Sequence, residues 1–181
     1  MPTLETDRLS LREIAAADDG FVLELMNEPA YLQHIGDRGV STVGAARAYI
    51  AQKLAPSYAK FGYGLYLVER RPSHEAIGIC GFVRRDSLEH PDIGFAFLQR
   101  HWSQGFALES ARAVLAHGFG PLGMKAILGV VSPGNDASVR LLEKLGFRFQ
   151  KMHKVPPGGR EALLFELQRP EAAPAPGVGG P

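Results

Sequence analysis

The segment from Asp92 to Leu108, DIGFAFLQRHWSQGFAL, contains the residue types that could bind an anion. An alternating apolar pattern, typical of a β-strand, runs into a turn with Gly105, and a helical pattern follows. The first turn of a helix presents unpaired backbone N–H groups, and a glycine there lets a diphosphate approach the backbone. An ordinary strand-to-helix turn would carry the same glycine, so this segment alone leaves both interpretations open.

The alternation within the strand separates two sets of side chains. One side carries Ile93, Phe95 and Phe97, and the other carries Asp92, Gly94, Ala96 and Leu98. The small side chains at Gly94 and Ala96 leave room for an extended ligand close to the backbone, beside the Asp92 carboxylate. Helix packing against the same side would explain the pattern equally well.

A second segment, NDASVRLLEKLGF from residue 135, predicts a helix with a polar group on its buried face. Asn135 is a good N-cap, and Ser138 shares a face with Leu141, Leu142 and Leu145. A hydroxyl on an inner face needs a hydrogen-bond partner. That partner is either a ligand or a nearby backbone group.

Several other chemistries are excluded by the residues present. The single cysteine, Cys80, cannot form an internal disulfide or a zinc-finger spacing, and its apolar neighbours indicate a small core residue. The sequence has no HExxH pair, no Gly-Lys-Ser/Thr loop, no GxGxxG fingerprint and no GxSxG elbow. We therefore expect no metal and no nucleophilic serine at an elbow.

Composition indicates a single globular domain of 181 residues in which 45% are hydrophobic and 22% charged. A net charge of +1 offers no argument for nucleic acid as a partner. No apolar run approaches the roughly 18 residues of a membrane span, and the first residues lack a signal-peptide pattern. These features predict a cytoplasmic protein with neither a membrane nor a nucleic-acid partner.

The periodicities predict a mixed α/β sheet with helices packed on it. Residues 1–169 form the domain, and residues 170–181, rich in Pro, Ala and Gly, are expected to be a flexible tail. The expected strands are 8–14, 63–70, 76–85, 92–98, 124–131, 147–151 and 161–168. The expected helices are 17–26, 41–54, 105–119 and 135–145, with a loop or broken helix at 27–39.

The order and spacing of these motifs resemble the GNAT acyltransferase superfamily over roughly residues 5–168. Its first motif, Q/R-x-x-G-x-G/A, is similar to the stretch from Trp102 to Ala107, and its second motif to Asn135, Ser138 and the pair Gly146–Phe147. The opening ETDRLSLREI and the stretches LMNEPAYLQHIGD and AIGICGF resemble the RimJ/RimL-like branch, which acetylates ribosomal-protein N-termini. The resemblance implies a mixed, mostly antiparallel central sheet with helices on both faces.

The resemblance also implies acetyl-CoA as the acyl donor and assigns residues to it. The pantetheine arm would pair with the backbone of Phe95, Ala96 and Phe97, and Asn135 would hold this arm or the turn around it. The diphosphate would bind the amides of Gln104, Gly105, Phe106, Ala107 and Leu108, and Trp102 would cover the cofactor or pack behind the loop. Two positions depart from the pattern: Ser103 stands at a usual glycine, and Leu142 stands where many members place a tyrosine general acid. In this branch Ser138 is the implied substitute for that tyrosine.

The remaining expectations concern the acceptor amine. Asp92 is the first candidate for its base, directly or through water, with His90 and His34 as rivals. The family's acceptor pocket corresponds to Tyr31–Arg38, which includes Tyr31 and His34, and to His153–Glu161. We expect transfer of an acetyl group directly to a primary amine, such as a protein or peptide N-terminus. A small-molecule amine acceptor and a non-catalytic acyl-CoA-binding module are the alternatives, and the chain is expected to be a monomer or homodimer.

Overall fold

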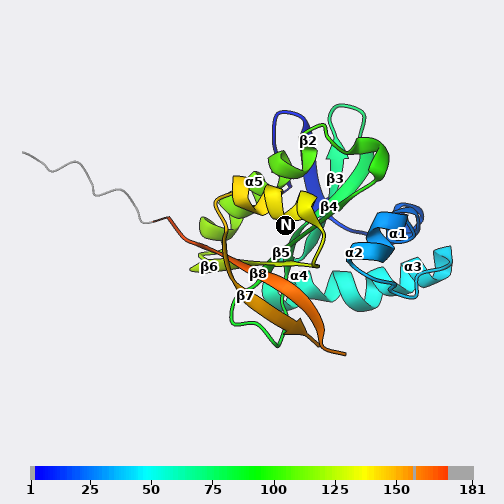
Figure 1. Cartoon of the computed structure of the whole chain (residues 1–181). Helices are drawn as coiled ribbons and strands as arrows, with labels where there is room; N and C mark the ends of the chain where they lie inside the picture. The colour runs from blue at the N-terminus through cyan, green and yellow to red at the C-terminus, as the bar shows by residue number, and fades with distance from the viewer. Residues whose placement is uncertain (1–2, 157, 171–181) are drawn as a thin grey trace, which may run out of the picture.

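The computed structural model of this protein describes residues 3–156 and 158–170, and they form an eight-stranded sheet covered by helices (Figure 1). The strands are arranged in the order β1-β2-β3-β4-β5-β6-β8-β7. Their bounds are β1 Leu4–Glu5, β2 Leu9–Glu13, β3 Leu65–Arg70, β4 Glu75–Val83, β5 Asp92–Phe97, β6 Ala126–Val131, β7 Arg148–Val155 and β8 Arg160–Gln168. The tail expected at 170–181 lies, from residue 171 on, outside the described residues.

The sheet is mixed, as predicted, because one of its strand pairs is parallel. Six of the seven neighbouring pairs run antiparallel, and β5 and β6 run parallel. The parallel register joins Asp92 to Leu128 and Ile93 to Gly129, and no further residue pair of these strands is registered. The sheet therefore opens between β5 and β6 after Ile93.

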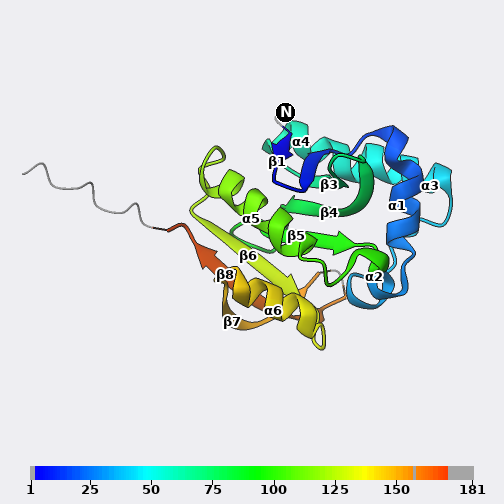
Figure 2. The same cartoon turned by 90° about the horizontal axis from the view of Figure 1, so that it is seen from above.

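Helices cover both faces of the sheet (Figures 1 and 2). The bounds are α1 Asp19–Met26, α2 Pro29–His34, α3 Val43–Tyr49, a π-helical turn Ile50–Leu54, α4 Ala55–Phe61, α5 Phe106–Phe119 and α6 Asp136–Lys144. The short 3₁₀ segments are Ala16–Asp18 and Gln99–His101. This arrangement confirms the expected helices on both faces.

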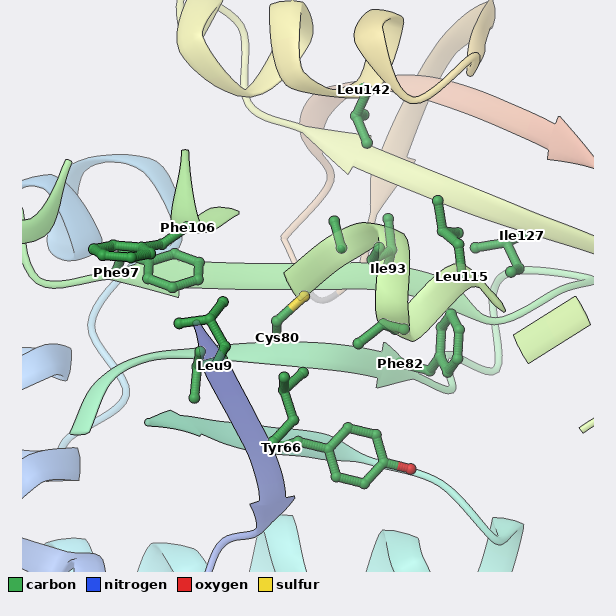
Figure 3. Close-up of a cluster of buried hydrophobic side chains, with 14 of the residues drawn as sticks. Leu9, Tyr66, Cys80, Phe82, Ile93, Phe97, Phe106, Leu115, Ile127 and Leu142 are labelled. Atoms are coloured by element: carbon green, nitrogen blue, oxygen red, sulfur yellow. The ribbon is translucent and has the colours of Figure 1, made fainter. Parts of the chain in front are cut away.

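Two hydrophobic clusters lie on opposite sides of the strands. The first core joins α5 and α6 to the sheet and includes Ile93, Phe97, Phe106 and Leu142 (Figure 3). The second core joins α1, α2, α3 and the π turn to the sheet and includes Leu98, with Ala96 packed against it. The alternation predicted along β5 is confirmed, because Ile93, Phe95 and Phe97 pack in the first core, whereas Ala96 and Leu98 pack in the second.

Cys80 lies fully buried in the first core, as its apolar neighbours predict (Figure 3). Burial raises the pKa of its thiol to about 12, with a smaller opposing effect from the Ser110 hydroxyl. A thiol with this pKa holds little thiolate at neutral pH. Cys80 is thus unsuited to carry an acyl group.

The helix predicted to end near Leu54 extends further than its periodicity indicated. The π turn joins α3 to α4, so that the chain stays helical to Phe61, and Pro56 lies in the first turn of α4. Buried residues recur every four positions at Ala46, Ile50, Leu54 and Tyr58. The first three belong to the second core and Tyr58 to the first. A proline usually marks a stop, but the wider π turn accommodates it.

Three shorter elements also differ from expectation. The broken helix expected at 27–39 contains α2, which begins at Pro29 because proline suits the first helical position. The two-residue strand β1 was not predicted, and β7 runs to Val155 instead of 151. Both lie at sheet edges, where side chains are exposed and alternation is weak. No helix among residues 3–156 and 158–170 is long and apolar enough to cross a membrane.

Candidate active site

The opening between β5 and β6 leaves backbone groups of β5 without a strand partner. The Leu98 N–H donates to the Ile77 carbonyl at 3.0 Å, which fixes the hydrogen-bonding phase of the β4–β5 ladder. In an antiparallel ladder this phase alternates, so the N–H and C=O groups of Phe95 and Phe97 point away from β4, towards the opening. The same alternation turns the backbone of Ala96 towards β4, so Ala96 could contribute only its side chain to the opening.

A cleft of about 620 Å³ occupies this opening and is lined from both faces of the sheet. Ile93, Phe97 and Leu142 line it from the first core, and Leu54 and Ile79 line it from the second. The cleft therefore passes between the diverging strands. Its size is typical of a small-molecule site.

The first turn of α5 borders the cleft with free backbone N–H groups. The helix begins at Phe106, and the first intrahelical bond runs from the Glu109 N–H to the Gly105 carbonyl at 3.0 Å. The amides of Phe106, Ala107 and Leu108 precede that bond. Gly105 has φ +81°, a left-handed conformation that glycine adopts without strain. Gly105, Phe106 and Ala107 line the cleft, whereas Gln104 and Leu108, which were also expected to bind the cofactor, do not.

Ser103 occupies a backbone conformation that explains the glycine usual at this position in similar proteins. Its φ is +60°, and a residue with a Cβ pays about 1–2 kcal/mol in that region. The neighbouring Trp102 is 46% exposed, and its indole N–H donates to the Phe97 carbonyl at 2.8 Å. Trp102 thus braces the loop against β5 while it lines the cleft.

Arg8 was not singled out from the sequence, yet it holds the start of α5. Its Nε donates to Glu109 at 2.7 Å, and one terminal nitrogen donates to the Gln104 carbonyl at 3.1 Å. The guanidinium also lies 4.6 Å from the centre of the Phe106 ring. Hydrogen bonds from Thr6 and Arg8 lower the pKa of Glu109 against the opposing effect of burial. About 100 residues separate Arg8 from these partners, so no local pattern could indicate the contact.

The start of α6 places Ser138 on the cleft, as the buried face of the helix predicted. The Ser138 N–H donates to Asn135 Oδ1 at 3.2 Å, so Asn135 caps the helix. The Ser138 side chain is half-buried and lines the cleft, and its Oγ has no hydrogen-bond partner among the described residues. A ligand could therefore use this hydroxyl without displacing a protein contact.

Leu142 occupies the usual tyrosine position and serves packing. It is 1% exposed, and its side chain lies directly over Gly129 of β6. A Cβ on Gly129 would lie 2.5 Å from a Leu142 methyl group, so the pair fits only with glycine there. Leu142 offers no proton, which leaves Ser138 as the hydroxyl of this helix nearest the cleft.

Asp92 lies at the cleft wall, but its carboxylate is already bonded. Its two oxygens accept from the Arg85 guanidinium at 2.8 and 3.2 Å, and the residue is 2% exposed. Burial raises the pKa of Asp92 above its ordinary value, against the opposing positive charge of Arg85. A carboxylate offers about four lone-pair sites, so this bidentate pair leaves it able to accept from a water.

The residues expected around the acceptor are brought together only in part. Tyr31 and His34 line the cleft with Ile35 and Arg38, and burial raises the pKa of Tyr31 to about 12. The Ser132 hydroxyl donates to the His34 carbonyl at 2.6 Å, which joins α2 to the loop after β6. His90 does not line the cleft and lies 3.9 Å from Glu89.

The last hairpin, expected at 153–161 as the second acceptor wall, does not line this cleft. Arg160 and Glu161 instead line a neighbouring pocket with His34 and Ser132. The side chains of β7 are mostly exposed at the sheet edge. The end of the cleft that contains Tyr31 is therefore formed by α2, the loop after it and the π turn.

Comparison with known proteins agrees with this geometry. A family model described as an acetyltransferase (GNAT) domain matches residues 8–148. An uncharacterized N-acetyltransferase of Bacillus subtilis, YoaA, is 34% identical over 81% of this chain and 83% of its own length. An acetyltransferase structure from Agrobacterium tumefaciens is 26% identical, with a TM-score of 0.78 over 93% of this chain and 95% of that one.

A structure of RimL, a ribosomal α-N-protein acetyltransferase in complex with coenzyme A, shares the fold with a TM-score of 0.79. It is 16% identical and covers 92% of this chain and 98% of that one. The fold and the cleft define an acyl-CoA-dependent transferase. The chain belongs to the GNAT family of N-acetyltransferases, in its RimJ/RimL-like branch, and uses acetyl-CoA as donor.

Proposed function

We propose that this enzyme transfers the acetyl group directly to a primary amine and that the N-terminus of a peptide or protein is its acceptor. The observation that carries the proposal is the continuous cleft, which joins the free backbone edge of β5 and the start of α5 to the polar side chains around Tyr31. Both substrates could meet in that cleft. RimL, an α-N-protein acetyltransferase, shares this fold, so the fold is compatible with a peptide amine as acceptor.

The donor end of the cleft fits a long ligand with an anionic end. The N–H and C=O groups of Phe95 and the N–H of Phe97 offer strand-like hydrogen bonds to the amide groups of a pantetheine arm, whereas the Phe97 C=O already accepts from the Trp102 indole. The free amides of Phe106, Ala107 and Leu108, together with the positive end of α5, suit a diphosphate. Acetyl-CoA supplies a thioester, so the acyl group arrives activated and no enzyme nucleophile is needed.

The acceptor must lose a proton before or during attack. An α-amine titrates at about 7.7–8.0 and a lysine at about 10.4, so an α-amine is partly neutral at physiological pH. We assign Asp92 as the base. It acts through a water, because its side chain is 2% exposed and is held by Arg85. His34 is the rival base that lines the same cleft.

The departing thiolate needs a hydrogen-bond donor. Ser138 fits this role because its hydroxyl faces the cleft and has no protein partner among the described residues. Asn135 positions Ser138 by capping the first turn of α6. We assign Ser138 as donor to the leaving thiolate.

A thiol-release assay with acetyl-CoA tests the proposal. The acceptor panel contains three groups: peptides with free N-termini, the same peptides with blocked N-termini and internal lysines, and small primary amines. Mass spectrometry locates the acetyl group on each product. Acetylation of free N-termini and not of blocked peptides is the expected result. Turnover confined to small amines would replace the peptide by a small-molecule acceptor, and the absence of amine-dependent thiol release would refute the proposal.

A further inference from the structure

Two cations at the acceptor end of the cleft lack a carboxylate partner. Arg38 follows α2 and Lys53 lies in the π turn; both are exposed and both line the cleft. Among residues 3–156 and 158–170, no carboxylate oxygen lies within 4.0 Å of either. Their positive charge is available to a ligand.

The two carboxylates that line the same cleft are engaged elsewhere. Glu28 accepts from the Gln99 N–H at 2.8 Å, and Asp92 accepts from Arg85. The Asp92–Arg85 pair is close to neutral as a unit. With Arg85 included, three cations and two carboxylates line the cleft, so its lining carries a surplus of positive charge. A site that binds only an amine does not require such a surplus.

Two phenol groups, those of Tyr31 and Tyr49, line the cleft together with these cations. The positive charge of Arg38 opposes the rise that burial causes in the pKa of Tyr31. Lys53 follows Tyr49 by four residues in continuous helical structure, and residues so spaced are neighbours on a helix surface. Arg38, Tyr31, Tyr49 and Lys53 together form a set that we name the cationic rim.

The cationic rim is poorly placed to bind the phosphates of the donor. The π turn that carries Lys53 packs in the second core, whereas α5, with its anion-binding first turn, packs in the first core. Both line the same cleft, but from opposite faces of the sheet. An anion bound at the cationic rim is therefore assigned to the acceptor and not to the donor.

We infer that the acceptor amine carries an anionic group, such as a carboxylate, which the cationic rim binds while the amine reaches the reaction centre. This inference rests on the proposed function and narrows its substrate class. Charged hydrogen bonds from Arg38 and Lys53 hold the anion, and the Tyr31 and Tyr49 hydroxyls add donors. The group can be an acidic side chain near a peptide N-terminus or the carboxylate of a small amine.

The test compares matched acceptors in the thiol-release assay with the full chain. One pair is Ser-Asp-Gly-Gly-amide against Ser-Asn-Gly-Gly-amide; the other is L-isoglutamine against L-glutamine amide. Within each pair only a carboxylate is exchanged for a neutral amide. We expect the anionic member of at least one pair to have a kcat/KM at least 10-fold higher, and the pair that responds identifies the source of the anion.

The variants Arg38→Gln and Lys53→Gln should each reduce that preference about 10-fold while the KM for acetyl-CoA stays unchanged. Lys60→Gln is the matched control, because Lys60 is an exposed α4 lysine outside the cleft lining and should keep the preference. Melting temperatures verify that each variant folds. Acetylation of both members of each pair at equal rates would overturn this inference alone, whereas no amine-dependent turnover would overturn the proposed function as well.

Discussion

Replacement of Ser138 by alanine should slow acetyl transfer without weakening the fold. The Oγ of Ser138 has no protein partner among the described residues, so its removal breaks no hydrogen bond of the protein. Asn135 still caps the helix in the variant, because the cap bonds to the backbone N–H of residue 138. The free energy of unfolding should change by about 0.5 kcal/mol or less, which is about 2 °C in Tm.

The kinetic effect depends on how much the thiolate needs a donor. A thiol titrates near 8.5, so its departure at neutral pH needs only modest help. General-acid assistance is typically worth about 10²–10⁴-fold, and a hydrogen bond to a thiolate belongs at or below the low end of this range. We expect kcat to fall by about 10-fold or more, which is about 1.4 kcal/mol in the activation barrier, with little change in acetyl-CoA affinity.

The assay measures single-turnover rate, kcat and Tm on the same preparation of Ser138→Ala. Ser138→Thr, which keeps the hydroxyl, should retain more of the rate. Ser132→Ala is a contrast, because it removes a hydrogen bond to the His34 carbonyl and should lower stability by about 1 kcal/mol. An unchanged single-turnover rate in Ser138→Ala would remove the side chain from the chemistry and leave water as the proton donor.

Three further predictions concern the cap, the loop and the base. Asn135→Asp preserves the N-cap and should keep Tm while it raises the KM for acetyl-CoA. Asn135→Ala should lower the free energy of unfolding by about 1 kcal/mol. An equal KM for Asn135→Asp and the wild type would show that residue 135 only caps the helix. Ser103→Gly relieves a left-handed φ and should raise the free energy of unfolding by about 0.5–1 kcal/mol, measured as an increase in Tm. A decrease in Tm would show that the Ser103 hydroxyl makes a compensating contact. If deprotonated Asp92 is the base, kcat/KM rises with pH through the pKa of Asp92, which burial raises above 3.8. Arg85→Gln removes a positive charge that lowers this pKa, so the rise in kcat/KM should move to higher pH. A rise that stays at the same pH would favour another base.

Local patterns predicted the parts of the site that depend on neighbouring residues. The two sides of β5 follow from alternation, the start of α5 follows from Gly105, and the capped first turn of α6 follows from Asn135. Each of these features is determined within one turn or one strand. They could be read before any long-range contact was known.

The contacts that join distant segments could not be predicted in this way. Arg8 reaches the start of α5 from the bend before β2, 96 residues from Gln104 in the sequence. Arg85 is only seven residues from Asp92, but their pairing depends on how the connection between β4 and β5 folds. The cationic rim combines the loop after α2 with the π turn, and its charges are unremarkable when each is considered alone. Their consequence appears only when the fold brings them to one cleft.

The divergence of β5 from β6 also divides the sheet into two halves that the parallel register joins at only two residue pairs. A backbone amide that donates a hydrogen bond to a neighbouring strand exchanges slowly with solvent deuterium. The Phe95 and Phe97 amides have no such strand partner, because they face the cleft. In the free enzyme these two amides should exchange faster than the amides of Ile79 and Cys80 in the neighbouring strand β4. A pantetheine arm along β5 would replace the missing strand, slow the exchange of both amides and join the two halves. Donor binding would in this way complete the sheet, and mechanical coupling between its halves would depend on whether the donor is bound.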